Sequence, residues 1–496
     1  MKISSWILFS LSLLLLVFTI PSYRSHIFAL NFVDEDDNIV IGNYVREGKK
    51  LYTDVFSQHQ PSMFLASSAI QNILKTDNIL MVVKRHREFM MLWSAIWVIV
   101  LVARFGFKGL FVSSGMELSK IVLLGNMFLA ESIVIYPLLY VILFILSSYK
   151  IRYKFEIWTL GIIFWFLVYS LTPLWPLLGL IAFLLYINSE DKKRLVTAWI
   201  SVGMLATFIL FFRVDLYDYF LNALYINYKY YIPLTTPVGF WDSLFKAFFA
   251  PVLALFNSGS SSLLLLVKVL ALSYLINIIF FITHKRYKTL ILFIMLPGLA
   301  SLRYIDPSNT LYGAFHMLPW LAVLVSLSLP IYYKSKLTNI SIYILIFLAS
   351  LNIARTQLFD LRDPATDFYV HYSPSVDIRE AVKILGKTGS QTIWVEPVMY
   401  WPHWQTGVSS YSYMVNYYGW MDQTLPMKKS LETQLAQQLP TIVYLETTLG
   451  IGKYLDSYDR FYRDGKPTNI YLRKDVAQGL TNETQKELDY YRFEIN

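Results

Sequence analysis

The sequence predicts an α-helical polytopic membrane protein, with about eleven transmembrane helices followed by a small extracytoplasmic α/β domain. Of its 496 residues, 55% are hydrophobic and only 16% are charged, whereas an ordinary soluble domain carries about 25% charged residues. Apolar segments of roughly 16 to 22 residues recur as far as residue 353, and such lengths can cross a bilayer. Residues 354–496 are polar enough to fold in water.

The apolar segments define a transmembrane domain over residues 1–353. The first follows Lys2 and has no clean cleavage site at its end, so we expect a signal anchor that is retained. The predicted spans are residues 6–26, 89–104, 110–130, 132–148, 157–172, 174–188, 195–212, 262–282, 289–303, 315–332 and 338–353.

Basic residues fall at alternate ends of these spans and therefore on one side of the membrane. They are Lys2, Arg104, Lys108, Lys150, Arg152, Lys154, Lys192, Lys193, Arg194, Lys285, Arg286, Lys288, Lys334 and Lys336. Cytoplasmic loops are enriched in Lys and Arg, so the N-terminus is predicted to be cytoplasmic. The first loop 27–88, the loops 213–261 and 302–314 and the C-terminal domain 354–496 are then extracytoplasmic, in a protein of the plasma or cytoplasmic membrane.

The net charge of +9 comes mainly from these loop residues, so the expected partner is membrane lipid and not nucleic acid. The chain contains no cysteine, which excludes disulfides and thiolate chemistry. One basic cluster, Lys84 to Arg87, falls on the outer side. It either anchors the second span or binds a lipid-linked phosphate. Residues 62–83 are expected to form an interfacial helix, because Lys75 and Asp77 would each cost about 2.5–3.5 kcal/mol inside a span.

The C-terminal domain repeats the order helix then strand. The segments VDIREAVKILGK and SLETQLAQQL have helical apolar spacing, and each is followed by a buried-strand pattern, QTIWVEP or TIVYLE. We therefore expect a small α/β domain. Its tyrosine-rich segment, residues 399–420, either packs in the domain core or stacks against the sugars of an acceptor glycan.

A run of four acids, DEDD at residues 34–37, follows the first span. Asp34 is expected to cap a helix that runs from about residue 35 to Glu47 and ends at Gly48. Capping accounts for only one or two of four mutually repelling acids. The others indicate either a divalent metal ion at Asp34, Asp36 and Asp37, or a carboxylate that acts as a general base.

Four features in order along the chain suggest a family. An acid pair, Asp34-Glu35, is followed by the loop GKKLYTDVFSQHQPSMF. The segment GNMFLAES then places Glu131 near the outer end of the third span, and RYIDPSNTLYGAFHMLPWLAVL leads from Arg303 into a late span. Together these resemble the membrane glycosyltransferases of the GT-C type. The closest likeness is to the family 39 protein mannosyltransferases, the aminoarabinose transferases and the RgtA-like bacterial group.

This resemblance implies transfer of a hexosyl or pentosyl group, with inversion, from a polyprenyl-phosphate sugar donor to an extracytoplasmic acceptor hydroxyl on a lipid, glycan or protein. Asp34 is the expected general base, with Glu35 supporting it. No cofactor is implied, and a metal-independent reaction is favoured. The residues expected to bind substrate or its phosphate are His59, Arg85, Arg87, Glu131, Arg303 and His316.

Two other functions fit the same pattern. A secondary transporter would explain many spans, but it predicts repeated halves and a site at the middle of the membrane. The sequence shows no convincing repeat, and mid-span charge is confined to Lys120 and Lys268. A ligase or polymerase acting on lipid-linked glycans would share the fold type. Motifs for ATP hydrolysis, zinc proteolysis and serine esterase chemistry do not occur.

Overall fold

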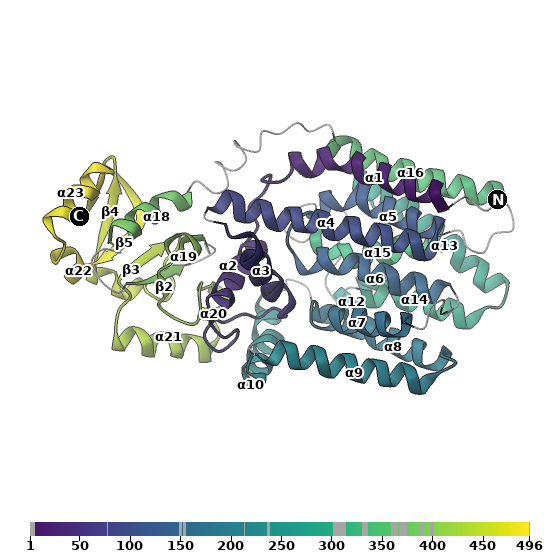
Figure 1. The fold of residues 1–496 in the computed structure, drawn as a ribbon, viewed down its shortest axis with the longest axis horizontal. Helices are drawn as coiled ribbons and strands as arrows, with labels where there is room; N and C mark the ends of the chain where they lie inside the picture. The colour runs from purple at the N-terminus through teal and green to yellow at the C-terminus, as the bar shows by residue number, and fades with distance from the viewer. Residues whose placement is uncertain are drawn as a thin grey trace.

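A computed structural model describes residues 5–76, 78–147, 151, 155–212, 214–235, 239–300, 314–329, 336–358, 366, 374–385, 391–396 and 401–495. The molecule is elongated, with a bundle of apolar helices at one end and an α/β domain at the other (Figure 1). Two helices, α2 Val33–Arg46 and α3 Ser62–Leu74, lie between these parts. They connect the bundle to the α/β domain.

The bundle consists of long and mostly apolar helices. Its members are α1 Ser5–Ser25, α4 Ile79–Phe105, α5 Phe107–Ser119, α6 Ala130–Leu146, α7 Glu156–Val168, α8 Trp175–Asn188, α9 Lys192–Phe211, α13 Ser262–Thr283, α14 Tyr287–Ala300, α15 Met317–Leu327 and α16 Lys336–Leu358. Among the described residues, α1, α4, α9 and α13 are long and apolar enough to cross a membrane. Large apolar side chains are exposed on α9, including Met204 and Phe208, which is typical of a lipid-facing surface. The chain is thus a helical, membrane-type protein, and the full count of eleven spans stays a prediction.

Three segments differ from the sequence prediction, namely the interfacial helix expected over 62–83, the span expected over 110–130 and the loop expected over 213–261. Residues 62–83 form no single helix, because α3 ends at Leu74 and α4 begins at Ile79. The third predicted span is broken after α5 by the short 3-10 helix Lys120–Leu123. The loop 213–261 holds α10 Leu216–Tyr219, the π-helix Phe220–Tyr231, α11 Ile232–Thr235 and α12 Phe240–Phe256. The last of these is an apolar helix that packs on α13 and α14.

Helix α2 begins about two residues earlier than expected, at Val33. Its N-cap is Phe32, which offers no side-chain cap, so the expected cap at Asp34 is wrong and Asp34 lies in the first turn. Acids in that position still complement the helix dipole. Packing against α3 is close at Gly42, where an added Cβ would meet the Ser67 Cβ and Oγ at 2.4 Å. Gly48 follows the helix with a φ of +94°, which favours glycine.

The α/β domain contains the predicted helix–strand repeats and an additional antiparallel part. Its strands are β1 Thr392–Glu396, β2 Ser409–Ser410, β3 Ile442–Leu445, β4 Tyr458–Arg463, β5 Lys466–Arg473 and β6 Phe493–Ile495, in the order β2-β1-β3-β5-β4-β6. Its helices are α18 Pro374–Leu385, α19 Trp401–Thr406, α20 Gly419–Asp422, α21 Leu425–Gln437, α22 Lys474–Gln478 and α23 Asn482–Tyr490. Strands β2, β1 and β3 are parallel, and the other pairs are antiparallel.

The α/β domain docks on the segment that follows α2. The Phe56 amide donates to the Tyr413 carbonyl at 2.7 Å, and the Phe56 ring lies 6.1 Å from that of Trp420. The Trp404 indole donates to Gln71 of α3 at 3.0 Å. The segment 399–420 therefore forms both domain core and a docking surface against the first loop.

Candidate active site

The two acids at the start of α2, Asp34 and Glu35, point in different directions, because a helix turns about 100° per residue. Glu35 is fully buried and accepts hydrogen bonds from Arg87 Nε and Nη2 and, at 2.8 Å, from the Phe128 amide. Arg87, on the third turn of α4, is also buried. A buried carboxylate that is paired in this way holds its own helix in place.

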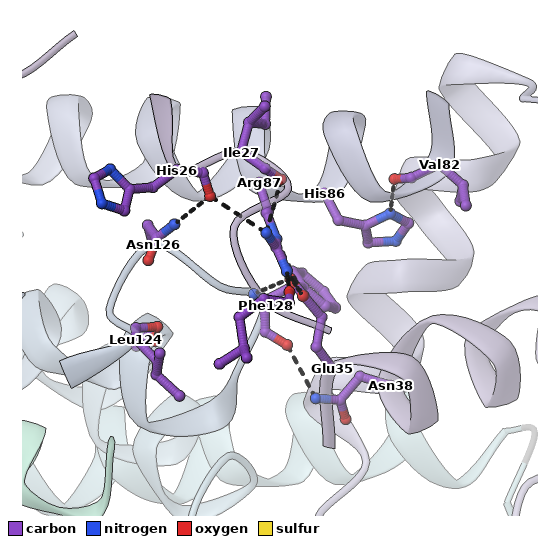
Figure 2. A network of polar contacts seen from close by, with 12 residues as sticks. His26, Ile27, Glu35, Asn38, Val82, His86, Arg87, Leu124, Asn126 and Phe128 are labelled. Carbon is purple, nitrogen blue, oxygen red and sulfur yellow. Dashed lines mark hydrogen bonds and ion pairs between the residues drawn. The ribbon is translucent and has the colours of Figure 1, made fainter. Parts of the chain in front are cut away.

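Arg87 also ties down the chain between α1 and α2. Its Nη1 donates to the Ile27 carbonyl and its Nη2 to the Leu30 carbonyl, each at 2.7 Å. Asn38, one turn beyond Glu35, donates to the Phe128 carbonyl at 3.0 Å. Figure 2 shows the resulting network, in which Arg87 of α4 meets the His26 and Ile27 carbonyls and Glu35 of α2, and Glu35 in turn meets Phe128 of the segment before α6. The binding of a lipid phosphate by Arg87 stays a prediction, and this geometry gives the side chain a positioning role.

Asp34 has a different environment from Glu35. It is partly exposed, whereas Glu35, Asp36 and Asp37 are buried. No described residue forms a hydrogen bond or ion pair with its carboxylate. Two residues earlier, Phe32 packs edge-on against Phe315, with ring centroids 5.0 Å apart. This contact brings the first turn of α2 beside the 3-10 helix Ala314–His316.

Two candidates chosen separately from the sequence lie in direct contact. His316 Nδ1 is 2.9 Å from Glu131 Oε1, although 185 positions separate them in the chain. Glu131 belongs to the first turn of α6, directly after the segment that binds Glu35 and Asn38. The first turns of α2 and α6 and the helix Ala314–His316 therefore converge at one end of the bundle.

The other acids of the run lie on different sides of α2. Asp37 Oδ2 is 3.9 Å from His59 Nε2, which places the predicted His59 beside the run. Burial, and then the negative charge of Glu35, raise the pKa of Asp36 well above its usual value, while Arg87 and the indole of Trp401 oppose that rise. Residues 34 and 37 share a helix face but 36 does not, so an ion held here would take Asp34 and Asp37. The described residues hold no cluster of three or more His, Asp or Glu suited to a metal.

One predicted phosphate ligand, Arg85, is not part of this convergence. Its side chain is 38% exposed and pairs with Glu88 on its own helix at 2.7 Å. Arg303 lies outside the described residues. Their role in donor binding stays a prediction.

Sequence reasoning identified Lys120 as a mid-span charge and missed its partner. The Lys120 ammonium is fully buried and donates to Glu117 Oε1 and Ser94 Oγ, each at 2.6 Å. Tyr136 and Tyr23 also donate to the Glu117 carboxylate. The signal was present, because residues three apart on a helix are neighbours. The charges of Lys120 and Glu117 are therefore paired with each other, and the hydrogen bonds around them connect α1, α4, α5 and α6.

A second polar region lies between α2 and α19. We call it the α2–α19 seam and define it by Asp36, Asn43, Tyr44, His403 and Asn416. Each of these side chains is at most 6% exposed. The Trp401 indole lies beside Asp36, and the backbone of Ser410 and of Val415 lies beside Tyr44 and His403 respectively. Burial lowers the pKa of His403 to about 4, so its ring is neutral at pH 7.

In comparisons with known proteins, no family model and no curated protein matches the sequence. The likeness to the GT-C glycosyltransferases therefore depends on the motifs of the chain. The activity that the likeness implies is argued below as a proposal.

Proposed function

We propose that this protein is a membrane glycosyltransferase that moves a sugar from a polyprenyl-phosphate donor to an extracytoplasmic acceptor hydroxyl. The observation that carries the proposal is the convergence of three distant segments at one end of the helix bundle. These are the first turn of α2 with the partly exposed Asp34, the first turn of α6 with Glu131, and the 3-10 helix Ala314–His316, whose His316 contacts Glu131. Each of these residues was selected from the sequence for this chemistry.

The proposed reaction is a single displacement. Asp34 accepts the proton of the acceptor hydroxyl as its oxygen attacks the anomeric carbon of the donor. The bond between that carbon and the phosphate oxygen breaks, and the phosphate leaves with the bonding electron pair. The configuration at the anomeric carbon is thereby inverted. Because phosphate is already a good leaving group, one carboxylate is enough for the proton transfer.

The residues around Asp34 support the proposed displacement by holding the reacting groups in position. The paired Glu35 and Arg87 fix the first turn of α2, so that Asp34 is held in one place. The hydrogen bond between Glu131 and His316 orients the imidazole ring. We propose that His316 and Arg303 face the donor phosphate, where cationic groups stabilise the charge that develops as the phosphate leaves.

The test uses purified full-length protein and a panel of radiolabelled polyprenyl-phosphate sugars with a crude acceptor extract. We expect the wild type to consume one donor and release polyprenyl phosphate. Asp34→Asn should lower this rate by about 100-fold to 10,000-fold, the usual contribution of a general base. The matched control is Asp489→Asn, at an exposed position on α23, which should keep the wild-type rate.

Two results would contradict the proposal. Full activity of a folded Asp34→Asn protein would remove the base. Failure of folded wild type to consume any donor would favour the transporter, which needs a sealed vesicle and not detergent. The transporter has less structural support, since the buried Lys120 is already paired with Glu117.

A further inference from the structure

The loop between α2 and α3 is held by a helix of unusual geometry. Residues Phe220–Tyr231 form a π-helix, in which the backbone hydrogen bonds join residues five apart. Asn222 donates to the Tyr52 carbonyl at 2.9 Å, and Asn227 donates to the Gln58 carbonyl at 2.7 Å. Two side chains of one helix therefore hold the loop at two points, which lie 170 and 169 positions away in the chain.

The π geometry aligns these two side-chain amides. An α-helix turns about 100° per residue, so side chains five residues apart on it point about 140° away from each other. A π-helix has more than four residues per turn, and residues five apart on it lie near one face. Asn222 and Asn227 are five apart. They therefore reach one loop in the π form, whereas in the α form they would diverge.

Tyr52 continues the contact from the π-helix to His59. Its backbone has a φ of +71°, in the left-handed region that a tyrosine rarely adopts. It is only 1% exposed, and its hydroxyl donates to the His59 carbonyl at 2.7 Å. Strained residues of this kind persist where the surrounding structure fixes them, and they cluster at functional sites. Asn222 supplies such a restraint, because it binds the carbonyl of Tyr52.

Three consecutive residues of the loop are held in this way. The carbonyls of Gln58 and His59 accept the bonds described above. The Gln60 side chain accepts a hydrogen bond at 2.9 Å from Tyr219, which directly precedes the π-helix. The His59 side chain is 27% exposed, and its Nε2 lies 3.9 Å from Asp37 Oδ2. A partly accessible imidazole on a fixed backbone suits a side chain that binds a ligand.

We propose that the π-helix positions the His59 imidazole for binding of the sugar donor. Its positioning residues are Asn222, Asn227 and Tyr52. This assignment rests on the proposed transferase function and adds the residues that hold one side of its donor site. They act through His59, so their loss raises the donor KM. The proton transfer to Asp34 is not affected, so kcat stays nearly unchanged.

The first measurement is amide hydrogen exchange over residues 48–62 of the full-length protein in detergent, which needs no substrate. Asn222→Ala and Asn227→Ala should each speed exchange there about three- to tenfold, because each removes one hydrogen bond to the loop. The matched control is Asn188→Ala, which removes an amide that donates to the Leu184 carbonyl within α8. It should exchange like the wild type. Melting temperatures show that each variant is folded.

The second measurement is the rate of donor consumption as a function of donor concentration. Asn227→Ala should raise the donor KM about three- to tenfold and leave kcat within about twofold of the wild-type value. The same change in a His59→Ala protein should raise KM no further, because the ring that the loop positions is gone. A change that merely loosened the fold would add to the loss in both backgrounds.

The outcomes separate this assignment from the proposed function. Unchanged exchange in both asparagine variants overturns the role of the π-helix. Faster exchange with an unchanged donor KM overturns the positioning role, and so does an equal rise in KM with and without the His59 ring. Failure of the wild type to consume any donor overturns the transferase and with it the donor role, while the exchange rates decide separately whether the π-helix holds the loop.

Discussion

Two faces of α2 treat buried polar groups in opposite ways. On one face, the Glu35 carboxylate meets Arg87 and the Phe128 amide, and Arg87 in turn binds two backbone carbonyls. On the other face, Tyr44 packs against His403 of α19; both are buried, and among the described residues they have backbone groups of Ser410 and Val415 beside them and no ion pair. A network in which charged groups have buried partners fixes a structure. We therefore expect the position of α2 to depend more on its contacts with the bundle than on those with the α/β domain.

The largest effect is expected from breaking the satisfied face. Arg87→Met leaves the Glu35 charge buried without its partner, so the free energy of unfolding should fall by about 3–5 kcal/mol. Arg85→Met, two residues away on the same helix, loses only an exposed pair with Glu88 and should change stability by about 1 kcal/mol or less. Thermal unfolding in detergent measures both.

The double variant Glu35→Leu/Arg87→Met separates the ion pair from local packing. It removes both charges, so it should be more stable than Arg87→Met alone. If Arg87→Met were no less stable than Arg85→Met, the contrast between the two faces of α2 would be lost.

The next effect concerns pH and the seam. Burial lowers the pKa of His403 from 6.5 to about 4, so the docked state requires the neutral ring. Its contribution to stability is complete above pH 6.5 and is lost as the pH falls toward 4, by up to about 3 kcal/mol. His403→Gln should lack this part of the pH dependence. Asp36 acts in the opposite direction, because its raised pKa favours the docked state at low pH, but it is present in both proteins.

The measurement is the difference between the melting temperatures of wild type and His403→Gln across pH 7 to 4, the range set by the two pKa values of His403. The wild type should lose stability faster as the pH falls. Parallel curves would show that His403 keeps access to water, and the seam would not then be a closed site.

A smaller effect is expected where α2 packs on α3. Gly42→Ala places a Cβ 2.4 Å from the Ser67 side chain, and such overpacking costs about 1–3 kcal/mol. Gly179→Ala on α8 is the matched control, because its added Cβ meets nothing within 4 Å. That change should be neutral or stabilising by up to about 1 kcal/mol, the gain from replacing a helical glycine. Equal melting temperatures for the two variants would contradict the close packing.

The sequence predicted the local elements better than the contacts between them. Strong apolar patterns located most bundle helices within a few residues, and the helix–strand repeat located α18, β1, α21 and β3. The adjacent acids Asp34 and Glu35 were assigned to one site. A helix turns about 100° per residue, so neighbours point in different directions. Which one is buried depends on Arg87, 52 positions away, and no local pattern encodes that pairing.

The smallest effect compares two buried tyrosine hydroxyls. Tyr44→Phe removes a hydroxyl that faces the backbone of Ser410 and no charged partner, so it should cost about 1 kcal/mol or less. Tyr136→Phe removes a hydroxyl that donates to Glu117, and it should cost about 1–3 kcal/mol. Equal losses of stability in the two variants would contradict this difference, because a hydroxyl bonded to a buried carboxylate should matter more than one that faces a backbone group.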